Sequence, residues 1–186
     1  MENIENYKNT LKQYAESQTD YNFQTIGKDY ALVVLERIIL SARRIVKYTS
    51  ESFYGDEVEK KMSFIEALCS FLSQPDTQLQ IIVSNVPENP KVKDSLNPYF
   101  RLYQTPAYRE GRITIKNAKG GHFMNNAKRV DFCVADTVMY RYESDTDKSI
   151  ASCNFNDSEF SNKIEGAFDA AFNTISDSVE LSSLFA

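Results

Sequence analysis

The sequence is poor in histidine, cysteine, glycine and proline, and each shortage excludes a class of protein. Its single histidine, His122, excludes a histidine-rich metal site and a histidine pair within one chain. Three widely separated cysteines, Cys69, Cys133 and Cys153, lie among apolar neighbours and indicate buried free thiols rather than disulfides or a zinc site. Six glycines and five prolines are too few for a linker-rich or collagen-like chain. We expect neither a metal nor a cofactor.

Long apolar runs are absent as well. No run approaches the roughly 20 residues that are needed to span a bilayer. Residues 1–6, Met-Glu-Asn-Ile-Glu-Asn, lack the basic-then-apolar order of a signal peptide. We therefore expect no membrane span and a cytoplasmic location, with a secreted chain whose signal has been trimmed away as the alternative.

The sequence has fewer basic than acidic residues, with 21 lysines and arginines against 26 aspartates and glutamates. The resulting net charge of −5 argues against a general nucleic-acid binder. The charge is uneven, however: residues 108–129 hold six cations and one anion, whereas residues 131–186 hold eleven acids and three bases. A local basic face is one interpretation, and a solvated loop that balances the acidic part is the favoured one. Nucleic acid is thus a disfavoured partner.

The length of 186 residues suits one compact domain with a substantial core. Apolar residues at helical spacing predict helices, and short β-branched runs predict strands. The predicted helices cover residues 2–16, 28–43, 57–74, 91–103 and 157–175, and the first strands cover residues 44–49, 79–83 and 112–116. We divide the chain into an N-terminal helix and loop (1–26), a main domain (27–176) and a loose C-terminal tail (177–186).

The stretch 131–156 is the predicted centre of the fold. Three strands are expected over residues 131–136, 137–142 and 151–156, with a reversal at Asp136-Thr137. The run 79–83 is almost wholly apolar, which is typical of an interior parallel strand. Polar side chains therefore collect at strand ends, where an α/β protein usually keeps its site.

Two local interactions follow from this arrangement. Asn156, followed by Glu159 three residues later, fits the N-cap and capping-box pattern of the last helix. Arg141 lies opposite the strand that carries Asp131 and Asp136, which predicts an ion pair across the hairpin.

The order of elements and two motifs resemble a single unit of the phospholipase D-like superfamily over residues 27–175. Units of that family carry a His-x-Lys strand, an Asp a few residues on, and a Gly-Ser-x-Asn strand. Ala151-Ser152-Cys153-Asn154 matches the last motif at Ser and Asn. The strand 131–136 is similar to the first motif, with Asp131 in place of His and Cys133 in place of Lys.

The resemblance implies an α/β fold in which helices flank both faces of a mixed sheet. It also implies a degenerate site. The vestigial cleft would consist of Asp131, Cys133, Asp136, Ser152, Asn154 and Asn156. Ser152, Asn154 and Asn156 also have a purely structural interpretation, namely strand-end hydrogen bonding and helix capping.

The degenerate motif argues against the family's catalysis, in which two units each supply a histidine and one histidine attacks phosphorus. A carboxylate at Asp131 would repel a phosphodiester, since two unit charges ~4 Å apart interact by roughly 4 kcal/mol at an effective dielectric constant of about 20. We therefore predict a catalytically silent domain of bacterial type, a pseudoenzyme that serves as a binding or assembly module. The resemblance implies a homodimer, and a subunit that docks on a separate partner protein is equally consistent with these residues.

The rival hypothesis is an enzyme, a phosphodiesterase or nuclease with a rearranged site. His122 is its candidate catalytic residue, because a dimer would present two copies of it. Lys128 would act as the phosphate clamp, and Arg141 would be a second phosphate contact.

Overall fold

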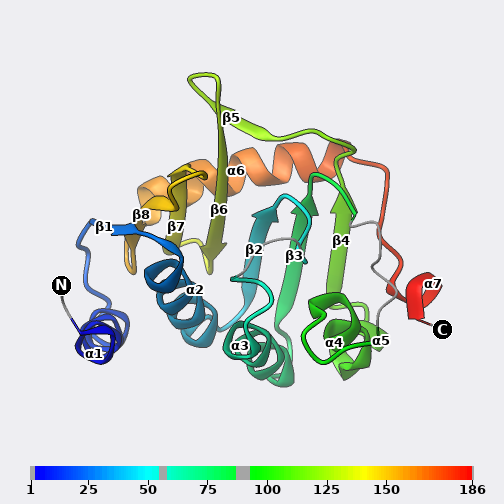
Figure 1. Ribbon diagram of the computed structural model, residues 1–186, viewed down its shortest axis with the longest axis horizontal. Coiled ribbons are helices and arrows are strands. Elements are labelled where there is room, and N and C mark those ends of the chain that lie inside the picture. The colour runs from blue at the N-terminus through cyan, green and yellow to red at the C-terminus, as the bar shows by residue number, and fades with distance from the viewer. Residues whose placement is uncertain (1–2, 55–57, 87–92, 186) are drawn as a thin grey trace.

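The protein is represented by a computed structural model, which describes residues 3–54, 58–86 and 93–185 (Figure 1). A mixed sheet forms its centre, with the strand order β1-β8-β7-β6-β2-β3-β4 and with β5 paired to β6. The strands are β1 Phe23–Ile26, β2 Ile45–Ser50, β3 Gln78–Val83, β4 Ile113–Asn117, β5 Phe123–Asn125, β6 Lys128–Ala135, β7 Met139–Asp145 and β8 Ile150–Asn154. The helices are α1 Ile4–Glu16, α2 Lys28–Ser41, α3 Met62–Ser73, α4 Pro98–Gln104, α5 Pro106–Arg109, α6 Ser158–Thr174 and α7 Leu181–Phe185.

The sheet is parallel on one side and antiparallel on the other. Strands β2, β3 and β4 run parallel, with Val46 beside Leu79 and Leu79 beside Ile113. Strands β6, β7, β8 and β1 pair antiparallel, and β6 joins the two parts through an antiparallel pairing with β2. The predicted parallel strand at residues 79–83 is confirmed, and the carboxyl ends of β2 and β3 therefore meet at one edge of the sheet.

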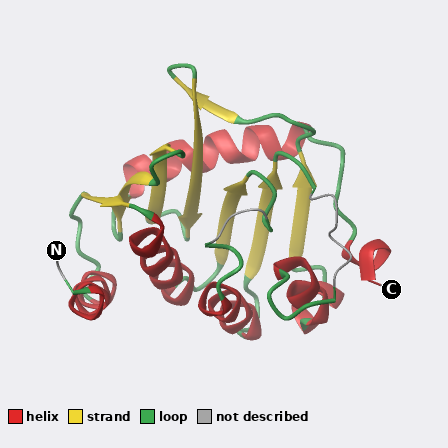
Figure 2. Ribbon diagram, in the orientation of Figure 1, coloured by secondary structure: helices red, strands yellow, loops and turns green. Residues whose placement is uncertain are grey.

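Helices cover both faces of the sheet, as predicted (Figure 2). Helices α2 and α3 pack on one face, where a large apolar core encloses residues such as Val34, Ile38 and Leu68. Helix α6 crosses the other face, where a smaller core surrounds Phe132 and Phe168. Side chains alternate along a strand, so consecutive residues of β6 enter different cores. None of the helices in the described part of the chain is long and apolar enough to cross a membrane.

Helix α6 forms where the sequence predicts it, but its cap differs. Ile164, Phe168 and Phe172 recur at spacings of four and are buried against the sheet. The N-cap is Asp157, whose carboxylate accepts the backbone N–H of Phe160 at 2.9 Å. The predicted cap at Asn156 is wrong because its side chain is engaged elsewhere, donating to the backbone oxygen of Gln18 at 2.9 Å.

Both ends of the chain are more ordered than the sequence indicates. The predicted loop before Gly27 contains β1, which pairs with β8 from Phe23 to Ile26. The predicted loose tail contains α7, whose Leu181 and Phe185 are buried in the main core. Both segments lie against the main domain (Figure 1). The domain boundaries at residues 26 and 177 therefore do not separate structural units.

The remaining differences concern element ends. Strand β6 begins at Lys128, three residues before its predicted start, because it pairs with β5 through a turn in which Asn126 and Ala127 both have positive φ. The predicted reversal at Asp136-Thr137 is confirmed, and these two residues also have positive φ. Residues 2, 57, 91 and 92 of the predicted helices lie outside the described residues.

Candidate functional site

One edge of the sheet gathers polar side chains from several strands. This edge, called the mouth below, consists of the carboxyl ends of β2 and β3, the start of β6 and the end of β7. The strand directions bring these ends together because β2 and β3 run toward the edge, β6 runs away from it and β7 returns to it. The mouth is also the edge at which α/β proteins commonly bind ligands.

An ion network centred on Arg129 occupies the mouth. Nε of Arg129 donates to Oδ2 of Asp131 at 3.1 Å, and Nη2 contacts the same oxygen. Nη1 donates to Oε2 of Glu51, which follows β2, at 2.5 Å. Thr49 supports the network, because its hydroxyl accepts the N–H of Phe132 at 2.7 Å and lies 3.5 Å from Oδ1 of Asp131.

Burial and hydrogen bonding act in opposite directions on the pKa of each member of this pair. Burial raises the pKa of Asp131, although hydrogen bonding to Arg129 opposes the rise. For Arg129, burial lowers the pKa, but hydrogen bonds to Asp131 and Glu51 outweigh it and raise the pKa further above its ordinary value. Arg129 therefore stays charged, while Asp131 is a carboxylate that its surroundings make easier to protonate.

Arg141 lies deeper on the same face of the sheet. It is 4% exposed, and its Nη1 donates to Oε2 of Glu143 at 3.0 Å. The predicted pairing of Arg141 with Asp131 or Asp136 is wrong. Glu143 is two residues away on the same strand face and is therefore nearer, and Asp131 is engaged by Arg129.

Asp136 lies at the opposite end of the sheet from the mouth. Its carboxylate accepts three backbone N–H groups, from Arg43 at 2.6 Å and from Arg44 and Ile45 at 2.9 Å. These bonds fix the approach of α2 to β2, so the role of Asp136 in this structure is to hold the connection between the two elements.

Cys133 is part of the core. Its side chain is 1% exposed, and burial raises the pKa of its thiol to about 12. It therefore carries no charge at neutral pH and does not reach the mouth. The two β6 residues that do reach the mouth at the spacing of a His-x-Lys pair are Arg129 and Asp131, which share one strand face.

Ser152, Asn154 and Asn156 are separated from Asp131. Asn154 donates to Asp20 at 2.9 Å and to Asn22 at 3.0 Å, and its side-chain oxygen accepts the N–H of Asn156 at 2.8 Å. These bonds hold the connection between α1 and β1. Ser152 sits within β8, in register with Tyr142. The six residues of the predicted cleft are thus not brought together, and the structural interpretation fits Asn154 and Asn156.

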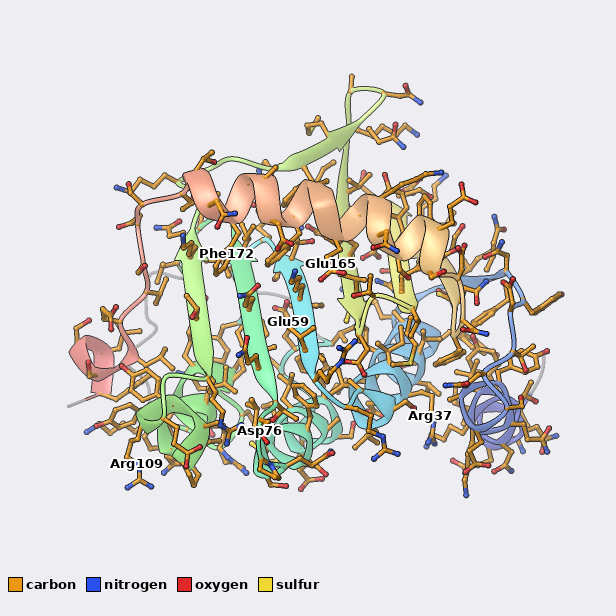
Figure 3. All side chains as sticks on the ribbon, turned by 180° about the vertical axis from the view of Figure 1, so that it is seen from behind. Arg37, Glu59, Asp76, Arg109, Glu165 and Phe172 are labelled. Atoms are coloured by element: carbon orange, nitrogen blue, oxygen red, sulfur yellow. The ribbon has the colours of Figure 1, made fainter. Side chains whose placement is uncertain are left out.

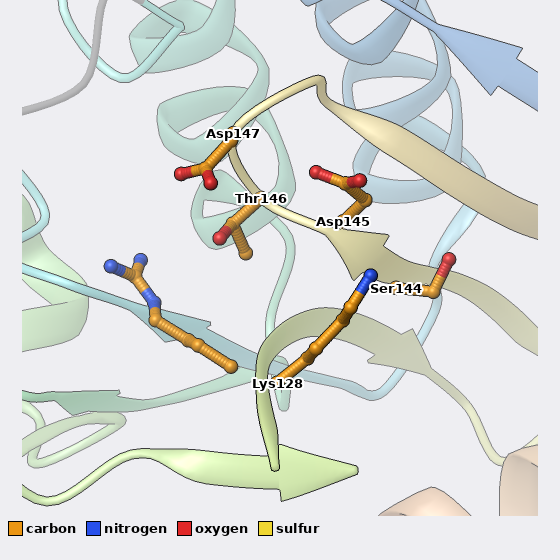
Figure 4. A pocket seen from close by; sticks show the side chains of 6 residues that line it. Lys128, Ser144, Asp145, Thr146 and Asp147 are labelled. Carbon is orange, nitrogen blue, oxygen red and sulfur yellow. The ribbon is translucent and has the colours of Figure 1, made fainter. Parts of the chain in front are cut away.

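Sequence reasoning missed the end of β7. A hollow of about 310 Å³ opens beside the mouth (Figure 4). It is lined by Lys128, Arg129, Ser144, Asp145, Thr146 and Asp147. The available signal was the order of the strands: β7 follows β6 through a tight turn, so the end of β7 must return to the start of β6, whereas β8 is one strand further away.

His122 lies at the rim of the mouth and is exposed. Its Nδ1 is 2.6 Å from the hydroxyl of Ser84, which follows β3. His122 is near enough to Asp131 that a positive charge on its ring would lower the pKa of that carboxyl group. Lys128, the predicted phosphate clamp, is exposed and lines the hollow. In the described residues no group of histidine, cysteine and carboxylate side chains is arranged to hold a metal ion.

The charges around the mouth do not suit an anionic substrate. Among the residues that the structure describes, acidic side chains outnumber basic ones there. The acids are Glu51, Asp131, Glu143, Asp145 and Asp147, and the bases are Lys128, Arg129 and Arg141. A phosphodiester that entered would meet a net negative surface, with Arg129 and Arg141 already engaged by carboxylates.

Comparison with known proteins identifies the fold. The sequence matches no protein-family model and no curated protein. The structure is similar to Nuc from Salmonella typhimurium, a phospholipase D family member, with a TM-score of 0.53 and 12% identity over 84% of this chain and 98% of that one. It is also similar to NucT from Helicobacter pylori, with a TM-score of 0.57 and 15% identity over 86% of this chain and 99% of that one.

A third similar structure is TrmBL2, an archaeal chromatin protein with a novel mode of DNA binding. The TM-score is 0.59 with 8% identity, and the match covers 94% of this chain and 62% of TrmBL2. The chain therefore has the phospholipase D-like fold, as its sequence predicted. Identities this low show the fold alone.

Proposed function

We propose that this protein is a catalytically silent phospholipase D-like domain that serves as a binding or assembly module. The observation that carries the proposal is the ion network at the mouth. Arg129 and Asp131 occupy the two β6 positions that reach the mouth, and they hold each other rather than an open substrate site.

The chemistry of the mouth supports this proposal. Attack on phosphorus through a histidine needs an imidazole aimed at the substrate and a cation that holds the phosphate oxygens. At the corresponding place β6 offers a guanidinium, which is a poor nucleophile because it stays protonated. Asp131 neutralises Arg129, the nearest cation on β6, so that this pair offers a phosphodiester little net attraction.

The expected partners are a second copy of the chain or a separate protein. The homodimer rests on the resemblance to units that meet in pairs, and a cytoplasmic location rests on the sequence. DNA is a disfavoured ligand because of the net charge of −5, even though TrmBL2 shows that this fold occurs in a DNA-binding protein.

The alternative function is a phosphodiesterase or nuclease that uses His122. One observation favours it: His122 is exposed at the mouth and is oriented by Ser84 at 2.6 Å, and Lys128 lies on the same edge of the sheet. A dimer built through this edge would bring two copies of His122 together.

The deciding experiment measures hydrolysis of bis(p-nitrophenyl) phosphate and single-stranded DNA after the mass in solution has been determined by light scattering. Wild type, His122→Ala and the distant control Arg109→Ala are compared. We expect no turnover from any of the three and a dimeric mass. Turnover that is lost in His122→Ala and kept in Arg109→Ala would replace the proposal by the alternative.

A second variant asks whether the scaffold retains the reaction geometry. Arg129→His with Asp131→Lys places a His-x-Lys pair on the two β6 residues that reach the mouth. Hydrolysis by this double variant would support the view that catalysis was lost through substitution of the two motif residues. Cys133→Lys is unsuitable for this test, because it would place a charge in the core.

A further inference from the structure

Another hollow, of about 500 Å³, lies at the end of the sheet away from the mouth. Its lining comes from the end of α1, the end of α2, the turn between β6 and β7, and Phe155 after β8. Asp136, which holds the connection from α2 to β2, is part of this lining. Sites for small molecules commonly measure roughly 300–1,000 Å³. The hollow is therefore large enough for a small molecule, and it is separate from the mouth.

Apolar side chains form one part of the wall. Met139 and Phe155 are buried, whereas Leu40 is 43% exposed although it is a large apolar residue. The apolar part of a ligand that covered Leu40 would remove this surface from water, and binding becomes more favourable in proportion to the apolar area that is removed. The hollow thus favours a ligand with an apolar part over a bare inorganic ion.

Two arginines of the lining have guanidinium groups without a partner. Neither Arg37 nor Arg43 has a hydrogen bond or an ion pair from its guanidinium group to another residue in the described part of the chain. Arg37 projects from α2 and is half-buried, and Arg43 is exposed (Figure 3). A guanidinium group presents its N–H donors in a planar fork that matches the two oxygens of a carboxylate or phosphate. The two side chains therefore offer donors to an anionic group.

The two carboxylates of the lining have other partners. The carboxylate of Asp136 accepts three backbone N–H groups. Glu16 is exposed, and its Oε1 lies 3.7 Å from Nζ of Lys12. Both negative charges still act on an anion that enters, and they oppose a dianion more than a monoanion. A carboxylate is therefore favoured over a phosphate monoester.

We propose that this hollow binds a small amphipathic anion, a carboxylate that carries an apolar chain. Arg37 and Arg43 hold the carboxylate, and the apolar chain lies on Leu40. The inference goes beyond the proposed function, because that function is carried by the ion network at the mouth, at the other end of the sheet.

The first test is calorimetric titration of the full chain with decanoate below its micelle concentration. Acetate keeps the carboxylate without the chain, decylammonium keeps the chain with the opposite charge, and decyl phosphate carries the chain on a dianion. We expect decanoate to bind most tightly, and acetate and decylammonium to bind about tenfold more weakly or worse, because each lacks one of the two matching parts. Decyl phosphate should also bind more weakly than decanoate.

Paired arginine variants test the residues. Arg37→Gln with Arg43→Gln should weaken decanoate binding about tenfold or more, because glutamine removes both the charge and the fork of donors. Arg44→Gln with Arg109→Gln is the matched control, since it removes the same two charges from exposed arginines that do not line the hollow. This control should bind decanoate as the wild type does.

Labelling of the methionine methyl groups with ¹³C places the ligand without any arginine variant. Decanoate should shift the methyl resonance of Met139, assigned by its loss in Met139→Leu. It should leave that of Met124 unchanged, which reports non-specific contact because Met124 is 58% exposed on β5.

Four results would overturn the inference. They are no binding of decanoate, equal or tighter binding of any comparison compound, an unmoved Met139 resonance, and equal binding of decanoate by the two double variants. Failure here is distinct from failure of the proposed function, because the hydrolysis assay depends on His122 at the mouth and not on this hollow.

Discussion

Lys47 connects β2 to α6 through a buried ion cluster, and its replacement by methionine should destabilise the protein. Its Nζ donates to Oε1 of Glu165 at 2.6 Å and to the two carboxylate oxygens of Asp169 at 2.7 and 2.9 Å. It also lies 5.9 Å from the ring centroid of Phe168. Glu165 projects from α6 toward the sheet (Figure 3). Methionine replaces the apolar stem of the lysine side chain with one of similar volume and removes the ammonium group.

The expected magnitude follows from how exposed each partner is. Glu165 is 16% exposed and would remain as a poorly hydrated carboxylate, and a hydrogen bond to a charged group contributes about 1.5–3 kcal/mol. Asp169 is 46% exposed, so water replaces Lys47 and its share is at most about 1 kcal/mol. The two contributions together, less what the packing of methionine restores, lower the free energy of unfolding by about 2–3 kcal/mol. At about 2–4 °C per kcal/mol for a chain of this size, Tm should fall by about 4–12 °C.

Urea unfolding followed by circular dichroism measures this loss. Lys163→Met is the control, because Lys163 forms an exposed ion pair with Glu159 on the same helix and should matter little. Lys47→Met with Glu165→Met should recover much of the stability, since apolar side chains then replace both partners. A midpoint for Lys47→Met equal to that of the wild type, or a double variant no more stable than the single one, would refute the reasoning.

Three further outcomes are expected. Cys133 and Cys153 should resist a thiol reagent at about pH 8 in the native protein, because burial raises both pKa values to about 12; labelling located by mass spectrometry would contradict this. Deletion of residues 177–186 should lower Tm, since burial of a side chain such as Phe185 contributes about 1.5–3 kcal/mol, and an unchanged Tm would mean that the tail is loose. Burial raises the pKa of Asp131 above 3.8, so the contribution of Asp131 to the stability of the wild type falls as pH rises through that raised pKa. Asp131→Asn should therefore become more stable relative to the wild type over the same pH range. A difference in urea midpoints that does not change with pH would contradict this prediction.

The elements that the sequence predicts well are those whose burial pattern is local. The spacing of Ile164, Phe168 and Phe172 defines one face of α6, and the apolar run of β3 indicates a strand covered on both faces. The sequence fails for β1 because Phe23–Ile26 alternates weakly and is stabilised by β8, which lies far along the chain. It fails for α7 because Leu181 and Phe185 gain their burial only after the main core exists.

The site was harder to predict than the fold, because it depends on which strand ends become neighbours. Ser152 and Asn154 belong to β8, whereas the strand beside β6 is β7. The residue types at Ser144 and Thr146 are unremarkable in isolation, and only the sheet order places them beside Arg129. Ion pairing is similarly context-dependent: Arg141 could face several carboxylates on the basis of the sequence, and strand alternation selects Glu143.

The segment after α6 lies along the outer side of β4 and limits how copies of this protein can associate. The backbone N–H of Asn117 donates to Asp177 at 2.9 Å, and that of Val179 donates to Ile115 at 2.9 Å, so the segment after α6 occupies the outer side of this strand. Growth of a filament by edge-to-edge pairing needs two free sheet edges on every copy. At the other end of the strand order β1 pairs with β8 alone, and an association through β1 by itself joins two molecules and then stops. The segment after α6 therefore blocks strand pairing along the half of β4 that it covers.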